Sequence, residues 1–460
     1  MRTHQYVPVA IFTALLIFRA SGVTLYVSLN STNHVAPYSN WARAATNIQV
    51  AVDAANNGDL ILVTNGLYNT GGVVVGPAAC SNRVAVTKPL TVQSVSGFAV
   101  TVIRGDNGIR CVYLTNAATL IGFTLTNGTT LGSGYDAHYG QSGGGLFSEQ
   151  GGVASNCFFT HNWSQQEGGG AYGGTLINCT LTTNVSYVGG GADACTLRNC
   201  ILYGNYANAF GGGAGSGDTV FNCTIVGNAA NQVGGGVCGD PVYNSIVYDN
   251  NASLGGPDYK NSNLYYCCTS SDPGFVGNII GSPLFVNEAA SDFHLQSNSP
   301  CINAANNSYV TNGTDFEGNP RIVGGTVDIG CYEYQTPVSQ ISYAWLQQFG
   351  LPINTNTDTA DPDHDGMNNY QEWIAGTNPT NALSVLAMLQ PVPTNSPTGL
   401  AVSWESVNNR TYFLQTSTNL AAQPAFTTVQ SNIVGLVGTT SYTDTNAVGP
   451  GPYFYRVGVQ

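Results

Sequence analysis

The sequence is poor in charge, above all in positive charge. Lys and Arg together number 12 against 25 Asp and Glu in 460 residues, and charged residues make up only 8% of the chain. The formal net charge is −13, and the few basic residues are scattered. Phosphate backbones and anionic lipid headgroups are bound by clustered positive charge, so we expect neither nucleic acid nor an anionic membrane surface as a partner.

The sequence also lacks an apolar run long enough to span a bilayer. Residues 1–22 instead have the pattern of a secretory signal: Arg2, an apolar run over residues 7–18, and small residues at positions 20–22 as a cleavage site. Arg19 leaves the exact cut open. We therefore expect export, with no membrane span after signal removal.

Glycine is abundant, at 57 residues, and much of it belongs to a repeat of about 22 residues that occurs five times. Each copy opens with three glycines, continues with an Asn, a small residue and an apolar strand, and closes on a second Asn. The triplets begin at Gly143, Gly168, Gly189, Gly211 and Gly234. The central pairs are Asn156-Cys157, Asn178-Cys179, Asn199-Cys200, Asn222-Cys223 and Asn244-Ser245. The closing residues are Asn162, Asn184, Asn205, Asn228 and Asn250.

The repeat predicts a solenoid of short strands. Repeats at a fixed period stack because one unit cannot bury a core alone, and Gly, Asn, Thr and β-branched residues favour strands and turns over helices. The apolar positions change parity at the first Asn, so the chain must turn a corner there. Asn tolerates the left-handed backbone of such a corner, and stacked Asn side chains can hydrogen-bond between coils. The glycine triplet marks a second corner, and the expected fold is all-β, a right-handed parallel β-helix.

Cysteine occurs 12 times, without the Cys-x-x-Cys or Cys/His spacing of a zinc site. Four of the cysteines fall at one position of the repeat, where we expect an inward file of unpaired thiols, because coils ~4.8 Å apart do not favour the disulfide dihedral. These are Cys157, Cys179, Cys200 and Cys223. Cys80 with Cys111, and Cys301 with Cys331, are candidate disulfides.

Family resemblances agree with this architecture. The glycine triplets and Asn-terminated strands resemble the repeats of polymorphic outer-membrane proteins. Residues 46–55 place Ile48, Ala51 and Val52 on one helical face, which predicts a lid over the open end of the β-helix. With the Gly58-Asp59 turn that follows, this opening resembles that of the pectin-lyase-like superfamily.

After Asn250, four motifs together resemble the closing module of exported bacterial β-helix proteins called choice-of-anchor Q. They are Asp292-Phe-His-Leu295, Ser299-Pro-Cys-Ile-Asn-Ala304, Asp315-Phe-Glu-Gly-Asn-Pro-Arg321 and Asp328-Ile-Gly-Cys-Tyr-Glu333. The resemblance covers roughly residues 45–335, and we expect the β-helix domain with its closing module to span residues 23–335. The resemblance implies that the protein reaches the extracellular space or outer surface of a bacterium.

Residues 336–383 are expected to form a calcium-binding helical linker. Carboxylates alternate as Asp361-x-Asp363-x-Asp365-Gly366, with Glu372 at the twelfth loop position. Ca²⁺ takes six to eight oxygens, and this spacing wraps carboxylates around one point with a sharp turn at the glycine. A backbone carbonyl and a water held by an amide would complete the shell, so the expected ligands are Asp361, Asp363, Asp365, Met367, Asn369 and Glu372. The motif resembles dockerin, EF-hand and thrombospondin type 3 loops; the alternative is an acidic linker without metal.

Residues 384–460 alternate as short strands between Pro and Gly turns, which predicts a small β-sandwich. Trp404 and the Tyr453-x-Tyr455-x-Val457 pattern resemble strands of fibronectin type III-like modules.

Catalysis has little support in the sequence. A lyase of this shape would need a basic residue beside acidic calcium ligands, and a hydrolase would need two or three carboxylates at a fixed separation. Over residues 141–260 the basic side chains are Arg198, Lys260 and His161. The acids there occupy different phases of the repeat and are not expected to converge: Glu149, Glu167, Asp193, Asp218, Asp240, Asp249 and Asp258. A polysaccharide lyase or glycoside hydrolase acting along the β-helix face is the alternative hypothesis.

Glycan binding has more support. Trp163 and Tyr206 both follow a closing Asn, two coils and therefore ~10 Å apart at ~4.8 Å per coil. Phe147 and Tyr172 share a second register on adjacent coils. The four aromatics are glycan-contact candidates, and the alternative is that they pack under loops. The expected protein is an exported, monomeric, non-catalytic scaffold for adhesion or glycan binding.

Overall fold

The computed structural model describes residues 22–75, 80–130, 140–149, 151–395 and 398–460. The predicted signal at residues 1–22 lies outside the described residues except for Gly22. The chain divides into two compact units, residues 1–264 and 265–460. The finer division predicted above stays a prediction.

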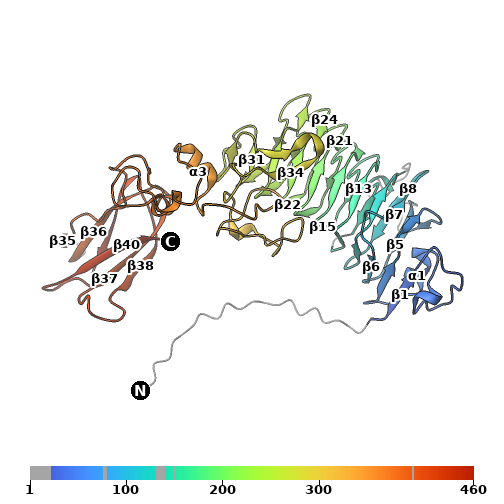
Figure 1. Cartoon of the computed structure of the whole chain (residues 1–460), viewed down its shortest axis with the longest axis horizontal. Coiled ribbons are helices and arrows are strands. Elements are labelled where there is room, and N and C mark those ends of the chain that lie inside the picture. The colour runs from blue at the N-terminus through green and yellow to red at the C-terminus, as the bar shows by residue number, and fades with distance from the viewer. Residues whose placement is uncertain (1–21, 76–79, 131–139, 150, 396–397) are drawn as a thin grey trace, which may run out of the picture. The chain divides into compact units, whose positions relative to one another are not determined.

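The first unit is a right-handed parallel β-helix, as predicted, with strands stacked as successive coils (Figure 1). Strands that return parallel within one sheet do so by right-handed connections. The longest sheet of the unit, sheet A, runs in the order β1 (Thr24–Val27), β2 (Leu60–Val63), β6 (Thr91–Ser94), β9 (Thr119–Ile121), β12 (Val153–Ser155), β15 (Thr175–Ile177), β19 (Thr196–Arg198), β22 (Thr219–Phe221), β26 (Pro241–Tyr243) and β30 (Asn263–Tyr265).

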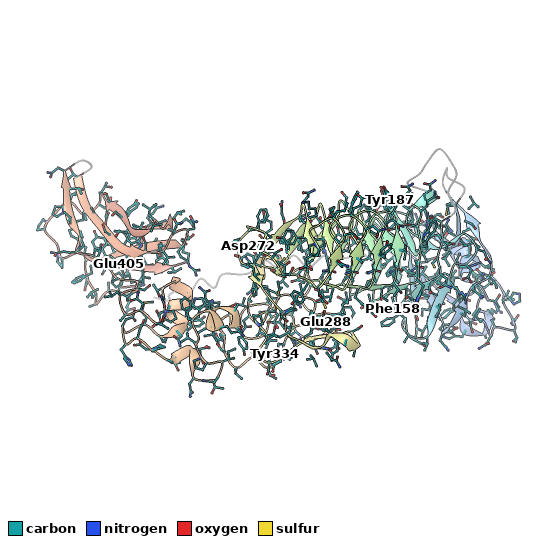
Figure 2. The ribbon with its side chains drawn as sticks, turned by 90° about the horizontal axis from the view of Figure 1, so that it is seen from above. Phe158, Tyr187, Asp272, Glu288, Tyr334 and Glu405 are labelled. Carbon is teal, nitrogen blue, oxygen red and sulfur yellow. The ribbon has the colours of Figure 1, made fainter. Side chains whose placement is uncertain are left out.

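Three further sheets complete the coils. Sheet B runs β3 (Gly66–Tyr68), β7 (Thr101–Arg104), β10 (Thr124–Thr126), β13 (Phe158–Thr160), β16 (Thr180–Thr182), β20 (Ile201–Tyr203), β23 (Thr224–Val226) and β27 (Ile246–Tyr248). Sheet C runs β18 (Ala192–Asp193), β14 (Ala171–Tyr172), β11 (Leu146–Ser148), β8 (Ile109–Leu114), β5 (Ser81–Val86) and β4 (Val73–Val74), with β25 (Val237–Cys238) paired to β29 (Tyr259–Lys260). Sheet D runs β17 (Val185–Ser186), β21 (Tyr206–Ala207), β24 (Ala229–Ala230) and β28 (Asn251–Ala252). Figure 2 shows Phe158 and Tyr187 on opposite sides of these coils.

Both predicted corners are present. The first Asn of every copy has a left-handed backbone, with φ between 50° and 52° at Asn156, Asn178, Asn199, Asn222 and Asn244. The second corner needs glycine for a different reason: a Cβ on Gly190 would lie 2.5 Å from the carbonyl oxygen of Gly212 in the next coil. The coils therefore approach too closely there for any larger residue.

The closing asparagines form a continuous ladder. Each Nδ2 donates to the Oδ1 of the next coil's asparagine, at 2.9 Å from Asn162 to Asn184, 3.0 Å to Asn205, 2.9 Å to Asn228 and 3.0 Å to Asn250. The last amide, that of Asn250, donates to Asp258 Oδ1 at 3.1 Å. The sequence pointed to stacked asparagines at the first corner, where Asn244 does donate to Asn222 at 3.2 Å. The longer ladder instead belongs to the closing position.

The interior thiol file is confirmed. Cys157, Cys179, Cys200 and Cys223 are at most 1% exposed. The two predicted disulfides are wrong, because all 12 cysteines are free and buried. Cys111 Sγ donates to the Thr126 carbonyl at 3.2 Å and Cys80 Sγ to the Ser81 carbonyl at 3.7 Å, so the two thiols are turned toward different backbone groups.

The N-terminal end has one more strand than the sequence indicated. The predicted first strand, β2, is preceded by β1, which pairs with it in parallel from Thr24 opposite Leu60. The predicted helix is α1 (Ile48–Ala54), capped by Asn47 and burying Ile48, Ala51 and Val52. Gln49 ties it to β5 through two hydrogen bonds with the backbone of Ala85, at 2.7 and 3.2 Å.

The second unit begins with short strand pairs and a loop-rich region. β31 (Cys268–Thr269) pairs in parallel with β32 (Ile279–Ile280), and β33 (Phe285–Asn287) pairs antiparallel with β34 (Asp292–Leu295). The acidic side chains of the motifs that follow accept hydrogen bonds from backbone N–H groups. Asp328 accepts from the N–H groups of Asn303 and Tyr334, at 2.7 and 2.6 Å, and Glu333 accepts from that of Asp328 at 3.0 Å.

The rest of the second unit is a helical linker and a β-sandwich. The linker holds α3 (Tyr343–Gln348) and α4 (Asn369–Ala375). One antiparallel sheet runs β35 (Val392–Asn395), β36 (Thr398–Ser406) and β39 (Gly438–Asp444), and the other β38 (Thr427–Val434), β37 (Thr411–Ser417) and β40 (Phe454–Val459). Val402, Trp404, Tyr412 and Leu414 form the sandwich core. Short 3₁₀ turns lie at Trp41–Arg43, Glu288–Ala290, Asn307–Tyr309 and Thr357–Thr359.

Within the described residues, none of the helices combines the length and apolar character that crossing a bilayer requires.

Candidate calcium loop and glycan-contact face

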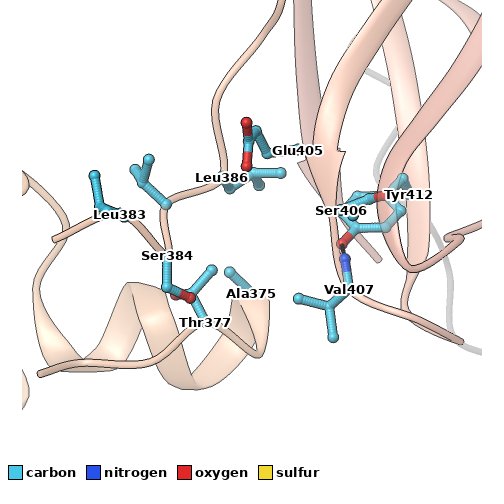
Figure 3. Close-up of a pocket in the computed structure, with 11 residues that line it drawn as sticks. Ala375, Thr377, Leu383, Ser384, Leu386, Glu405, Ser406, Val407 and Tyr412 are labelled. Carbon is cyan, nitrogen blue, oxygen red and sulfur yellow. Dashed lines mark hydrogen bonds between the residues drawn. The ribbon is translucent and has the colours of Figure 1, made fainter. Parts of the chain in front are cut away.

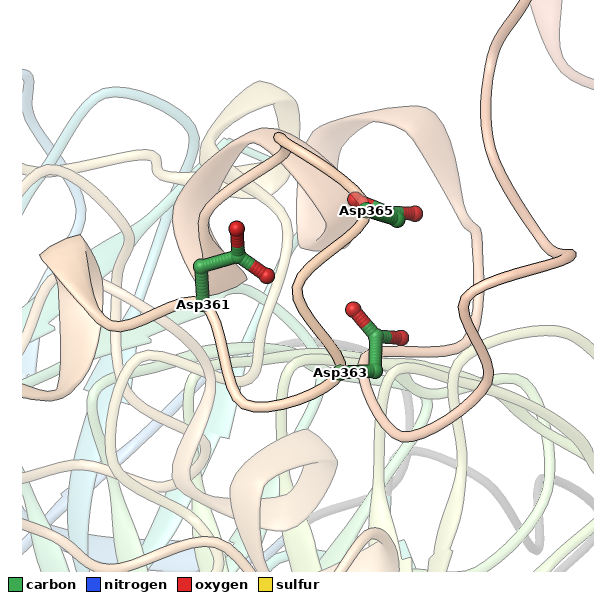
Figure 4. A group of neighbouring side chains, drawn as sticks. All are labelled: Asp361, Asp363 and Asp365. Atoms are coloured by element: carbon green, nitrogen blue, oxygen red, sulfur yellow. The ribbon is translucent and has the colours of Figure 1, made fainter.

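The three aspartates of the predicted calcium loop converge on one point. Asp361, Asp363 and Asp365 each offer a carboxylate oxygen, and these oxygens lie within 4.8 Å of one another (Figure 4). Backbone donors hold the loop in this shape: Asp361 accepts from the N–H groups of His364 and Gly366, at 2.8 and 3.2 Å. Gly366 has φ of 96°, a conformation that suits glycine at the sharp turn.

Helix α4 carries two further candidate ligands, Asn369 and Glu372. Glu372 lies outside the group of three carboxylates that converge within 4.8 Å, although the charges of Asp363 and Asp365 act on it. The N-terminus of α4 is fixed by a capping box in which Asn368 and Gln371 exchange side-chain and backbone hydrogen bonds. Asn369 is 1% exposed and Glu372 is completely buried. Asn369 Nδ2 donates to the Thr357 carbonyl at 2.8 Å, so its Oδ1 is the atom left for a ligand.

Several oxygens of this cluster are buried without a hydrogen-bond donor. They are both carboxylate oxygens of Asp363, Oδ2 of Asp365, Oδ1 of Asn369 and Oε2 of Glu372. Burial, followed by the charges of Asp363 and Asp365, raises the pKa of Glu372 to about 7. Buried anionic oxygens without partners are costly unless a cation offsets them, and a set made only of oxygen suits a hard ion such as Ca²⁺. The residues present fit the ion; the carbonyl of Met367 as a ligand stays a prediction.

A cavity of about 210 Å³ separates the end of α4 from the sandwich, lined by Ala375, Thr377, Leu386, Val407 and Tyr412 among others (Figure 3). Thr377 Oγ1 donates to Glu372 Oε1 at 3.4 Å, and Arg410 Nη2 donates to the Trp373 carbonyl at 3.3 Å. The candidate calcium ligand Glu372 is therefore linked through α4 to the sandwich.

The predicted alignment of Trp163 with Tyr206 is present. Trp163 lies opposite Val185, and Val185 lies opposite Tyr206 in the next coil. Trp163 is 40% exposed and Tyr206 is half-buried. The two rings therefore stand on one outward column, two coils apart.

The second aromatic pair is mostly unsuited to binding. Phe147 and Tyr172 are neighbours on adjacent coils, with ring centroids 5.2 Å apart. Phe147 is only 4% exposed, because Val73 and Val75 pack over the cluster it forms with Tyr113. The glycan-contact assignment of Phe147 is wrong, and Tyr172 presents only the part of its ring that this cluster leaves uncovered.

No family model matches the chain, and no curated protein does. Among solved structures, pectate lyase Pel9A is 16% identical, with 68% of this chain and 98% of that chain covered at a TM-score of 0.38. A rhamnogalacturonan lyase is 12% identical, with 54% and 68% covered at a TM-score of 0.29. Likenesses this weak carry no argument, and the fold assignment rests on the strand pairing above.

The sequence missed a column of buried acids. Asp193, Asp218 and Asp240 were expected to diverge, but they gather between successive coils and are at most 4% exposed. The Cys195 N–H donates to Asp218 Oδ1 at 2.6 Å, and the Asp218 N–H donates to Asp240 Oδ1 at 2.9 Å. The sequence does contain a signal for this column. Cys195 and Asp218 each directly precede a threonine that starts a strand of sheet A, and the two threonines are paired, so Cys195 and Asp218 occupy equivalent positions on adjacent coils.

Burial raises the pKa of Asp218 to about 7. Burial, joined by the neighbouring charge of Asp218, raises the pKa of Asp240 to about 10 and that of Asp193 well above its usual range. These carboxyl groups are closed to a polymeric substrate, and they are neutral in the folded coil at mildly acidic pH.

A histidine outside the repeat was also missed. His294 Nδ1 lies 2.6 Å from Asp292 Oδ1, its Nε2 lies 3.3 Å from Glu317 Oε1, and its ring stacks on Tyr332 at 4.0 Å. Burial acts to lower its pKa, but the hydrogen bonds to Asp292 and Glu317 outweigh burial and raise it. Both ring nitrogens are engaged by carboxylates, which favours a bridging role over proton transfer to a substrate.

Proposed function

We propose that the protein is an exported, non-catalytic scaffold of the bacterial surface or its surroundings, and that its β-helix contacts glycans for adhesion. The observation that carries the proposal is the aligned pair Trp163 and Tyr206, held two coils apart on a rigid stack of strands. Aromatic faces fixed at such a spacing offer flat apolar surfaces to the C–H faces of successive sugar rings.

The surroundings of the other polar side chains support a non-catalytic role. Arg83 donates to the carbonyls of Gly71, Arg104 and Gly105, and Arg110 to those of Ser142 and Gly143. Guanidinium groups engaged with backbone in this way are poorly placed to act on a substrate. The acids of the repeat that do converge are buried between coils.

We further propose that Ca²⁺ binds Asp361, Asp363, Asp365 and Glu372, with Asn369 and the Met367 carbonyl completing the shell. The ion would fix the loop to α4 and thereby stiffen the connection to the sandwich. The support is the set of buried oxygens without donors and the hydrogen bond from Arg410 to the end of α4.

The test of this function separates binding from turnover. The purified chain is incubated with a panel of neutral and acidic polysaccharides, binding is followed by affinity electrophoresis, and products are assayed as unsaturated uronides and new reducing ends. Binding without product is the expected result. Product formation would support the lyase or glycosidase hypothesis instead, and neither binding nor product would leave a purely structural protein and overturn the proposal.

A further inference from the structure

Sheet D carries a second outward column beside that of Trp163 and Tyr206. The first column runs Trp163, Val185, Tyr206, Ala229 and Asn251. The second lies two residues further along each coil and runs Gln165, Tyr187, Asn208, Asn231 and Ser253. All five members of the second column are exposed. We call these two columns together the sheet D face.

The sheet D face combines aromatic rings with amides. Tyr187 is 47% exposed and belongs to the coil between those of Trp163 and Tyr206, so the three rings alternate between the columns. None of the three rings stacks on another aromatic in the described part of the chain. Gln165, Asn208 and Asn231 supply donors and acceptors beside the rings, which sugar hydroxyl groups require.

The face contains no ionisable acid or base other than the tyrosine hydroxyls. A carboxylate-bearing polymer would find no cation here, and the net charge of −13 would repel it. An uncharged polymer needs no cation on the face and is not repelled by the net charge. The charge of the protein therefore favours uncharged polysaccharides over uronates.

The face is also held rigid from beneath. Ser186, Ala207 and Ala230 separate the two columns and point inward, where each is at most 4% exposed. The asparagine ladder lies immediately before the first column, and Asn184 accepts from the backbone of Asn162 while its own N–H donates to Asn205. A surface fixed in this way loses little entropy when a ligand binds.

We infer that the sheet D face binds an uncharged polysaccharide whose chain runs along the axis of the β-helix. The columns repeat once per coil, so a polymer parallel to the axis meets an outward position of each column at every coil, with aromatic rings on three successive coils. Sugar rings stack on Trp163 and Tyr206, the intervening ring lies beside Tyr187, and the amides bond to hydroxyl groups. The two-coil step of ~10 Å matches the advance of two sugar rings in an extended β-1,4-linked chain. This inference rests on the proposed glycan contact and adds the class and direction of the ligand.

Isothermal titration calorimetry with β-1,4-linked glucan oligosaccharides, set against sodium polygalacturonate, tests the ligand class. We expect binding of the glucan series, with a sharp gain from two to four sugar units because only the longer chains reach both Trp163 and Tyr206. We expect no heat from the polyuronate. Binding of the polyuronate alone would overturn the ligand class while leaving the proposed glycan contact standing; no binding of either, or of any glycan in the wider panel, would overturn both.

Variants test the location. Trp163→Ala, Tyr187→Ala and Tyr206→Ala are each expected to weaken glucan binding about tenfold, the effect of losing one aromatic anchor. Trp163→Phe keeps a ring and should retain most of the affinity, which guards against a folding artefact. Phe98→Ala is the matched control, because Phe98 is 42% exposed but stacks on Phe158 away from sheet D. Undiminished binding in all three alanine variants would place the site elsewhere.

Discussion

The backbone N–H of Asp218 donates a 2.9 Å hydrogen bond to Oδ1 of Asp240, one coil further along the β-helix. The second carboxyl oxygen of each residue is buried without a hydrogen-bond partner. Asp193 and the Cys195 thiol face the same column. Two buried carboxyl groups in consecutive coils are tolerated when neutral and repel one another when ionised.

This arrangement predicts that the middle of the β-helix is stabilised by mild acid. The folded pKa values, about 7 for Asp218 and about 10 for Asp240, lie above the unfolded value of about 3.9. The folded coil therefore holds protons that the unfolded chain releases. Stability falls as pH rises above about 4, up to about pH 7 for the contribution of Asp218 and up to about pH 10 for that of Asp240. Hydrogen exchange of peptides within residues 192–244 should be measured at pH 5, 7 and 9. We expect the exchange rate to rise with pH by more than the intrinsic exchange rate of unstructured peptides does.

Asp218→Asn and Asp240→Asn should flatten this profile, because an amide of the same shape stays neutral at every pH. Asp249→Asn, at an exposed position of the same unit, should leave it unchanged. Parallel profiles for the wild type and both buried variants would contradict the assignment.

Calcium binding is predicted with one ion per chain. Asp363→Ala combined with Asp365→Ala should abolish calorimetric Ca²⁺ uptake, since it removes two carboxylates and three of the five oxygens that are buried without donors. It should also open residues 355–380 to limited proteolysis, because the loop would lose the ion that holds it to α4. Asp272→Asn, an exposed acid of the same unit, is the control. Unchanged uptake in the double variant would reject the site.

The asparagine ladder should be costly to interrupt. Asn205→Ala removes the acceptor of Asn184 and the donor to Asn228, and buried polar groups left without partners should lower the free energy of unfolding by at least about 2 kcal/mol. Asn231→Ala removes an exposed amide from the same unit and should cost little. Denaturant titration of both variants measures the difference. Equal unfolding midpoints for Asn205→Ala and Asn231→Ala would mean that the ladder does not contribute to stability.

The thiols are predicted to be free and shielded. Native protein should take up no alkylating reagent, and the protein unfolded in guanidinium without reductant should take up 12 equivalents, because all 12 cysteines are unpaired and buried. Mass spectrometry counts the adducts. A count lower by two, with residues 80 and 111 or 301 and 331 unlabelled, would restore the disulfide interpretation.

The coil was predictable because its determinants are local. Side-chain alternation and the left-handed backbone of Asn178 are properties of a few adjacent residues, and stacking repeats them. The calcium loop was predictable for the same reason, since spacing alone brings Asp361 and Asp365 to one side of a turn. Its link to the sandwich was not, because Arg410 is far from α4 in the chain.

The acid column and the burial of Phe147 were not predicted for one reason: both depend on contacts between parts of the chain that the repeat pattern does not relate to one another. The contact between Asp218 and Asp240 can be predicted only once the number of residues in each coil is known. In the preceding coil the position equivalent to Asp218 is occupied by Cys195. The burial of Phe147 depends on Val73 and Val75, which belong to a segment outside the regular repeat. The sequence pattern of one repeat copy does not indicate that residues from outside the repeat will bury its side chains.

The asparagine ladder also has a direction. Every amide receives a hydrogen bond through its oxygen and passes one on through its nitrogen, so the series can continue only while the next residue can do both. Asp258 receives from Asn250 but, as a carboxylate, has no proton to hand on. The series of side-chain hydrogen bonds therefore runs one way along the β-helix, from Asn162 at its start to the carboxyl group of Asp258 at its end.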